Sequence, residues 1–214
     1  MEVAIAGAHG KIGMLLGRLL VERGDIVWGL IRNPAHEDDL HAAGIEPALC
    51  DLEADDADVA AAVRGAEAVV FAAGAGPGSG AERKRTMDYG GAVKLIEAAK
   101  AEGVRRYLMV SSIGAGNPPT EGGDVFGEYL RAKAAADRDL VASGLEYTIV
   151  RPGPLSDDPP RGLVKVGEDL DRVEISRADV AAVLAACLDL RHTIDRTFEV
   201  VGGEIAIDTA LASI

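Results

Sequence analysis

Hydrophobic and polar residues alternate along this chain in blocks that predict strands and helices in turn. Apolar runs of strand length lie at residues 2–6, 25–31, 45–50, 67–71, 105–111 and 146–150. Between them, apolar residues recur at helical spacing, as Ile12, Leu16 and Leu20 do behind the first run. The spacing predicts a helix after Gly10 and further helices over 35–43, 55–64, 81–101, 125–142 and 177–188.

Strict alternation of strands and helices predicts an α/β fold of the Rossmann type. We expect a doubly wound parallel sheet with helices on both faces, and right-handed crossovers give the strand order 3-2-1-4-5-6. A segment around 163–174, a strand over 197–201 and a last helix predict a small C-terminal extension. We expect a single domain over residues 1–214, in which residues 153–214 contribute one side of a ligand site.

Three loops rich in glycine, proline and polar residues follow predicted strands, at 74–80, 114–124 and 153–162. In such a sheet, the loops that follow the carboxyl ends of the strands surround the ligand. Their clustering predicts a pocket for a small-molecule substrate at this edge.

Composition excludes several classes of function. The chain has 22 Lys and Arg against 35 Asp and Glu, a net charge of −13, which argues against binding to nucleic acids or to anionic membranes. We find no apolar run near the roughly 18 residues of a membrane span and no basic segment of a secretion signal, so we expect a cytoplasmic protein. Cys50 and Cys187 are expected to act as small hydrophobic residues, and the four histidines show no metal-ligand spacing.

Three glycines, Gly7, Gly10 and Gly13, join the first strand to the first helix. Unpaired N–H groups at a helix N-terminus form a site for a pyrophosphate, and glycine lets the phosphates approach the backbone. His9, Lys11 and Ile12 belong to the same turn and are expected to contact this cofactor. The alternative is an ordinary strand-to-helix turn without a ligand.

Arg32 stands 19 positions after Gly13, at the end of the second strand. In a dinucleotide-binding unit the residue at this place faces the adenosine ribose, and arginine suits the 2′-phosphate of NADP. The sequence therefore favours NADP(H) over NAD(H), although a solvated arginine before a turn would look the same. Asp51 and Leu52, after the third strand, are expected either to hold the adenine edge or to cap the loop. Small residues after the fourth strand would let the cofactor lie against the sheet: Ala72, Ala73 and Gly74.

Tyr129 and Lys133 form a Y-x-x-x-K pair, which places both side chains on one face of a predicted helix. An ammonium group favours the phenolate, which would make Tyr129 a proton donor and acceptor. Lys133 could also bond the nicotinamide ribose, and a serine after the fifth strand could fix a substrate carbonyl. The alternative is an inert pair in which Lys133 makes a surface ion pair with Asp137.

These features together resemble the short-chain dehydrogenase/reductase superfamily, in its atypical branch of single-domain NAD(P)-binding proteins. The resemblance covers nearly the whole chain and lies in the three-glycine turn, Arg32-Asn33-Pro34, Asp51-Leu52, Ala72-Ala73-Gly74, Asp88-Tyr89-x-Gly91, Ser111-Ser112-Ile113-Gly114, Tyr129-x-x-x-Lys133, Arg151-Pro152-Gly153-Pro154-Leu155 and Ser176-Arg177-Ala178-Asp179-Val180-Ala181.

The resemblance implies Tyr129 as the acid/base, Lys133 as its partner and Ser112 rather than Ser111 as the orienting hydroxyl. Asp88 occupies a place where much of the superfamily has asparagine, which leaves a proton-relay role open. Further implied cofactor contacts are Ser111, Lys133, Pro152 and Gly153.

The resemblance implies three functions. The leading hypothesis is an NADP(H)-dependent oxidoreductase that transfers hydride to a small carbonyl-like or flavin-type acceptor. The first alternative is a non-catalytic NADP(H) sensor of the NmrA-like kind. The second is a sugar epimerase/dehydratase, against which the missing larger C-terminal domain of such enzymes counts. The sequence leaves open whether the protein is a monomer or a homodimer.

Overall fold

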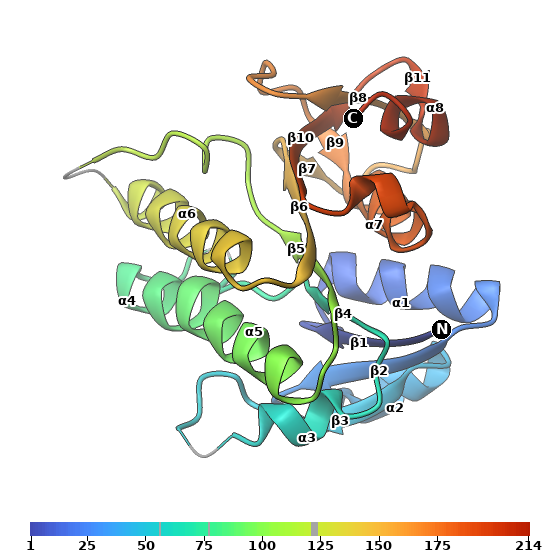
Figure 1. Cartoon of the computed structure of the whole chain (residues 1–214), viewed down its shortest axis with the longest axis vertical. Coiled ribbons are helices and arrows are strands. Elements are labelled where there is room, and N and C mark those ends of the chain that lie inside the picture. The colour runs from blue at the N-terminus through green and yellow to red at the C-terminus, as the bar shows by residue number, and fades with distance from the viewer. Residues whose placement is uncertain (56, 77, 121–123) are drawn as a thin grey trace.

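The computed structural model describes residues 1–55, 57–76, 78–120 and 124–214. Part of the predicted helix 55–64 (Asp56) and parts of the predicted loops 74–80 (Pro77) and 114–124 (residues 121–123) lie outside the described residues. Within those ranges, nine strands form one sheet in the order β11-β8-β10-β6-β5-β4-β1-β2-β3 (Figure 1). The predicted order 3-2-1-4-5-6 is confirmed, and all five pairings inside it are parallel.

The strands of this sheet are β1 (Glu2–Ala6), β2 (Ile26–Ile31), β3 (Glu46–Leu49), β4 (Ala68–Phe71), β5 (Arg106–Val110), β6 (Glu146–Pro152), β8 (Leu163–Gly167), β10 (Arg196–Gly202) and β11 (Ile205–Ala206). A second, small sheet pairs β7 (Leu155–Ser156) with β9 (Ile175–Ser176). The helices are α1 (Lys11–Arg23), α2 (Glu37–Ala42), α3 (Val59–Val63), α4 (Ala81–Arg83), α5 (Ala92–Ala101), α6 (Val125–Ala142), α7 (Arg177–Asp189) and α8 (Ile207–Leu211), with 3-10 turns at Pro34–His36 and Arg191–Thr193.

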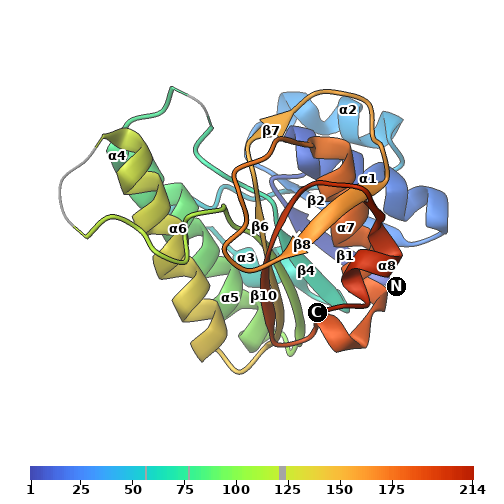
Figure 2. The same cartoon turned by 90° about the horizontal axis from the view of Figure 1, so that it is seen from above.

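Helices cover both faces of the sheet, as the hydrophobic pattern predicts. Figure 2 shows α1, α2, α7 and α8 on one side of the strands and α3, α5 and α6 on the other. One buried cluster includes Leu16 and Leu20 of α1 together with Leu184 of α7. A second cluster, on the opposite face, includes Leu95 of α5 and Leu140 of α6.

The C-terminal extension continues the sheet instead of standing apart from it. β10 pairs with β6 in parallel, whereas β8 pairs antiparallel with β10 and β11 pairs antiparallel with β8. The C-terminal extension therefore adds an antiparallel edge to the parallel sheet that the sequence predicts. The reason is that residues 153–167 turn the chain back, so that β8 runs against its neighbour.

The predicted helix 81–101 is continuous, but its middle is not an α-helix. Residues Lys84–Gly91 form a π-helix between α4 and α5. The predicted helix 55–64 is shorter than expected, because the side chain of Asp58 accepts a hydrogen bond from the N–H of Ala61 and so begins α3 at Val59. π-helical turns are rare and frequently lie at functional sites, so the π-helix Lys84–Gly91 is a candidate part of the functional site.

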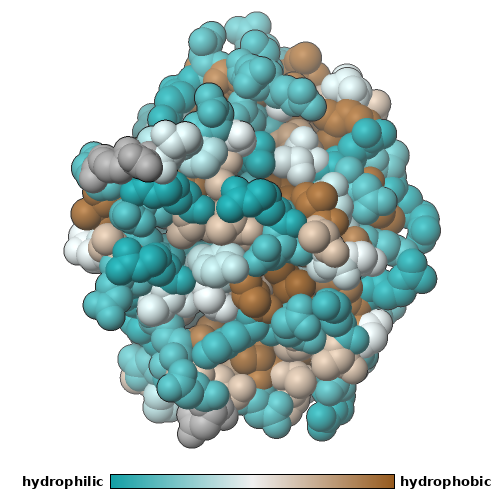
Figure 3. Space-filling model, turned by 60° about the vertical axis from the view of Figure 1, so that its left-hand side comes forward, coloured by the Kyte–Doolittle hydropathy of each residue, from teal (hydrophilic) through white to brown (hydrophobic). Residues whose placement is uncertain are grey.

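Figure 3 shows a mostly hydrophilic face in which apolar residues emerge in patches near the centre. Within the described part of the chain, no helix combines the length and the hydropathy needed to cross a lipid bilayer.

Candidate functional site

The turn between β1 and α1 is built so that only glycine fits at two of its three glycine positions. Gly7 has φ +81°, and a Cβ on it would lie 2.6 Å from Cα of Ala73 at the end of β4. A Cβ on Gly13 would lie 2.3 Å from the carbonyl oxygen of Gly7. These glycines let α1 begin close against the strand ends.

The first turn of α1 is open to an anion. Its N-cap is Gly10, and no described side chain caps the N–H groups that begin the helix. These groups carry the positive end of the helix dipole, and Gly10, Lys11 and Ile12 of this turn line a groove of about 570 Å³. The donor set and the close glycine backbone fit the pyrophosphate of a dinucleotide.

The groove continues from the glycine turn past the ends of β2 and β3. Arg32 lies on its wall, but its guanidinium is not free, because Nη1 donates to Oε2 of Glu53 over 3.2 Å. The same oxygen accepts two hydrogen bonds from Arg83, each 3.1 Å long. Two cations therefore meet one carboxylate where the adenosine ribose is expected. Sequence reasoning missed Glu53 and Arg83, since neither belongs to a motif.

Asp51 caps its own loop, because its Oδ1 accepts a hydrogen bond of 2.9 Å from the N–H of Glu53. It also lines the groove beside Leu52. Of the two roles considered for Asp51, the loop cap is present in the structure, and adenine contact stays a prediction.

His9 does not simply point into solvent from the loop. Its ring stacks on that of His36, with centroids 3.6 Å apart, and its Nε2 lies 2.8 Å from Oδ2 of Asp39. Both rings line the groove. The pair connects the glycine turn to the segment after β2.

A larger cavity, of about 800 Å³, opens beside the groove at the carboxyl ends of β4, β5 and β6. The two hollows share lining residues, so a single elongated ligand can extend from one into the other. The shared residues are Ile12, Ala72, Ala73, Gly74, Gly76 and Arg177.

Tyr129 and Lys133 face this cavity from α6. Lys133 is buried, and its Nζ donates to the carbonyl oxygen of Val110 over 2.9 Å. Nζ also lies 5.9 Å from the centroid of the Tyr129 ring and 5.2 Å from that of Phe71. The ammonium group thus stands between the end of β5 and the phenol.

Asp88 belongs to the same cluster and lies in the π-helix. It is 1% exposed, and its Oδ1 lies 3.6 Å from Nζ of Lys133. Its Oδ2 accepts a hydrogen bond of 3.3 Å from the N–H of Ala75. Among the described residues Oδ1 has no hydrogen-bond partner. A buried oxygen of this kind can receive a donor from a ligand in the cavity.

The two serines after β5 differ in their surroundings. Ser111 donates to Oδ2 of Asp137 over 2.9 Å, whereas among the described residues Ser112 makes only a 3.3 Å bond to the carbonyl oxygen of Ile113. Both line the cavity. Ser112 is thus the less committed hydroxyl, as an orienting role requires.

Asp137 corrects one reading of the sequence. It is 3% exposed and does not form a surface ion pair with Lys133. Its Oδ2 instead accepts a hydrogen bond of 3.0 Å from Nε of Arg151 on β6 and lies 2.9 Å from Nη2 of the same guanidinium in an ion pair. Burial raises the pKa of the Asp137 carboxyl, and Arg151 and Ser111 partly offset this rise. The ion pair of Asp137 and Arg151 holds the hydroxyl of Ser111 in place through the hydrogen bond to Asp137.

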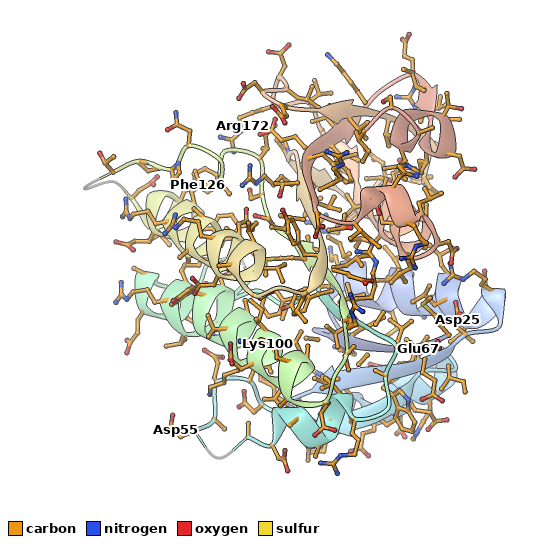
Figure 4. All side chains as sticks on the ribbon, viewed as in Figure 1. Asp25, Asp55, Glu67, Lys100, Phe126 and Arg172 are labelled. Atoms are coloured by element: carbon orange, nitrogen blue, oxygen red, sulfur yellow. The ribbon has the colours of Figure 1, made fainter. Side chains whose placement is uncertain are left out.

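Two further features of the cavity were not predicted. Lys84, in the π-helix, is buried, donates to the carbonyl oxygen of Gly76 over 2.9 Å and lies 5.3 Å from the Tyr129 ring centroid. At the rim, Cζ of Arg172 lies 5.2 Å from the Phe126 ring centroid, and Figure 4 shows these two residues approaching from the extension and from α6. A lysine within a helical pattern is usually exposed, so the sequence did not indicate that Lys84 is buried beside the cavity.

The structure brings the predicted site residues together in two adjoining hollows. The groove is lined by Gly7, His9, Gly10, Lys11, Ile12, Arg32, Asp51, Leu52, Ala72, Ala73 and Gly74. The cavity is lined by Asp88, Ser111, Ser112, Tyr129, Lys133, Pro152 and Gly153 in addition to Ile12 and Ala72–Gly74. Gly13 borders neither hollow, because it packs inside the first turn of α1. Gly153 meets the extension, where a Cβ would lie 2.3 Å from the carbonyl oxygen of Val173.

Comparison with known proteins agrees with this geometry. The Bacillus subtilis protein YhfK, described as an uncharacterized sugar epimerase, is 39% identical over 212 residues, which cover 99% of both chains. A Bacillus halodurans structure, provisionally described as an NAD-dependent epimerase/dehydratase, superposes with a TM-score of 0.93 at 38% identity and full coverage of both chains.

A third relative is described as a reductase. ChuY, an anaerobillin reductase from Escherichia coli O157:H7, superposes with a TM-score of 0.80 at 25% identity, over 94% of this chain and 97% of its own. The model of the NAD(P)H-binding family matches residues 7–191, from the first glycine of the turn to the end of α7 and beyond. The chain therefore belongs to the NAD(P)H-binding family of Rossmann proteins, among relatives that include oxidoreductases and epimerase/dehydratase-like proteins.

Proposed function

We propose that this protein is an NADP(H)-dependent oxidoreductase of the atypical short-chain dehydrogenase/reductase type. The observation that carries the proposal is the junction of groove and cavity. A dinucleotide in the groove would end beside Ala72–Gly74, which are also part of the wall that holds Tyr129 and Lys133. The acceptor would be a small carbonyl-like or flavin-type molecule, and residues 153–214 would contribute its side of the pocket within a single domain.

When bound, the reduced cofactor supplies a hydride, and the protein supplies the proton and the geometry. Tyr129 would donate its phenolic proton to the oxygen of a carbonyl acceptor as the carbon is reduced, and solvent would then return a proton to the phenolate. Lys133 would hold a positive charge beside the reacting phenol, since its Nζ lies 5.9 Å from the Tyr129 ring centroid. Ser112 would hold the carbonyl oxygen in place.

Asp88 has a positioning role in this proposal. Its carboxylate forms an ion pair with Lys133 and accepts a hydrogen bond from the N–H of Ala75, so it would orient the lysine and connect it to the loop after β4. A proton relay through Asp88 is not required. The preference for NADP(H) is based on Arg32, which adds positive charge at the place expected for the 2′-phosphate. The cytoplasmic location and the choice between monomer and homodimer stay predictions.

The test is the Tyr129→Phe variant, assayed with NADPH and NADH against a panel of carbonyls, quinones and flavins. Reduction of carbonyls should fall by about 100-fold or more, the scale of a lost general acid, while NADPH binding is unchanged. Undiminished carbonyl reduction by the variant would remove Tyr129 from the chemistry. Flavin reduction can persist in the variant, because hydride can pass directly to a stacked ring.

The relatives described as epimerases favour a second candidate, an epimerase/dehydratase-like enzyme. It would use the same hydride chemistry at a sugar carbon. Release of a reduced product with net consumption of NADPH supports the oxidoreductase, whereas isomerisation of a sugar without net consumption supports the epimerase. The NmrA-like sensor predicts no NADPH oxidation with any acceptor, but cofactor-dependent protection of loops 74–80 and 114–124 in hydrogen exchange.

A further inference from the structure

One carboxylate joins two cations that line the cofactor groove, Lys11 and Arg177. Asp157 follows β7, and its Oδ1 accepts a bond of 2.7 Å from Nη1 of Arg177, the first residue of α7. Its other oxygen, Oδ2, accepts a hydrogen bond from Nζ of Lys11, the first residue of α1. The extension and the glycine turn thus meet through a single acidic side chain.

The bridge between Lys11, Asp157 and Arg177 lies beside the place expected for the pyrophosphate of a dinucleotide. Lys11 begins the helix whose first-turn N–H groups are open to an anion. α1 and α7 pack against each other on one face of the sheet (Figure 1). Arg177 borders both the groove and the cavity, so its side chain lies at their junction. A dinucleotide that extends from one hollow into the other has its pyrophosphate between them.

The charges at this place favour exchange of one anion for another. Asp157 is more than half exposed, and Lys11 still more so, so water and salt weaken their attraction. Lys11 and Arg177 together carry one more positive charge than Asp157 neutralises. A pyrophosphate brings more negative charge than one carboxylate and offers the oxygen pairs that a guanidinium binds best.

We propose that Arg177 and Lys11 bind the pyrophosphate of the dinucleotide, and that Asp157 is the counterion that they exchange for it. Asp157 therefore acts as an internal competitor that lowers cofactor affinity, and Arg177 is a cofactor-binding residue from the C-terminal extension. The inference deepens the proposed function and depends on dinucleotide binding in the groove. It predicts equal effects on NADPH and NADH, because the pyrophosphate is common to both.

The test measures dissociation constants of NADPH and NADH by calorimetry for the whole chain and its variants. Asp157→Asn should tighten binding of both cofactors by about threefold to tenfold, and Arg177→Gln should weaken both by about tenfold, the low end for a charge-assisted bond at a partly exposed site. Asp158→Asn is the matched control, since it makes the same charge change one residue later. It should leave both constants within about twofold of the wild type, the scale of long-range screening.

A structural role for the bridge would give a different pattern. If Asp157 only holds the extension against α1, Asp157→Asn should weaken binding or leave it unchanged, and either result overturns the proposal. Unchanged binding by Arg177→Gln overturns it as well. Thermal unfolding of each variant checks folding, and Lys11→Gln provides a second test of the same cation pair should Arg177→Gln fail to fold. A wild-type chain that binds neither cofactor refutes the proposed function itself, whereas normal wild-type binding with unshifted variants refutes this inference alone.

Discussion

Replacing Arg151 with methionine should lower the free energy of unfolding, because it leaves the buried carboxylate of Asp137 without its cation. The Asp137 side chain is 4% exposed and that of Arg151 is 19% exposed, and Oδ2 of Asp137 takes one hydrogen bond from Nε of Arg151, one from Ser111 and an ion-pair contact with Nη2 of Arg151. Breaking a buried ion pair on one side costs about 3–5 kcal/mol, and the partial exposure of Arg151 places this variant near about 3 kcal/mol. For a domain of this size the thermal midpoint should fall by about 6–12 °C.

The loss of stability should depend on pH with a definite sign. Burial already raises the pKa of the Asp137 carboxyl, and removing Arg151 takes away a cause that lowers it. The folded variant then binds a proton that the unfolded chain has released, so its stability falls as pH rises above the unfolded pKa of about 3.9 toward the raised folded value. Differential scanning calorimetry should therefore find a smaller gap to the wild type at pH 5 than at pH 8.

A second substitution separates charge from volume. Adding Asp137→Asn to Arg151→Met removes the buried charge with almost no change in size, and it should recover a large part of the lost stability. A double variant as unstable as Arg151→Met alone, or a gap that does not change with pH, would refute the buried-charge reasoning.

Two further predictions concern the core and the glycine turn. Gly13→Ala should abolish tight dinucleotide binding and lower the thermal midpoint, because its Cβ would overlap the carbonyl oxygen of Gly7 at 2.3 Å. Gly24→Ala is the control: its Cβ meets open space but its φ is +94°. It should cost only the strain of that conformation, about 1 kcal/mol, and leave binding intact. Burial raises the pKa of the Cys187 thiol to about 12 and also raises that of Cys50, so a thiol reagent at pH 8 should label the native protein slowly and the urea-unfolded chain at once. Rapid labelling of native Cys187 would contradict the buried environment.

The alternation of strands and helices was sufficient to predict the central sheet. Short crossovers of one hand leave few possible arrangements, and the order 3-2-1-4-5-6 follows. The strand at the C-terminal edge, β8, could have been predicted, because Leu163, Val164 and Val166 give a strand-like run around Lys165. The π-helix was not, since a shift of hydrogen bonds by one residue leaves no mark in composition.

The sequence predicted less about the polar residues behind the site. Asp137 was open to reading as a surface partner of Lys133, yet a residue four places after a sheet-facing lysine shares its face. That spacing, together with buried Ala136 and Leu140, was the signal for a buried acid. Glu53 and Asp157 carried no comparable signal, because their partners Arg32 and Lys11 come from distant parts of the chain.

The most direct test of the account is a titration of the wild-type chain with NADPH and NADH, repeated on Arg32→Gln. We expect both cofactors to bind, NADPH more tightly by about tenfold, the low end for one charge-assisted contact because Glu53 already accepts from Arg32. The variant should lose this preference while keeping its affinity for NADH. Binding of neither cofactor at millimolar concentration would contradict the account as a whole, and tighter binding of NADH would contradict the assignment of Arg32 to the 2′-phosphate.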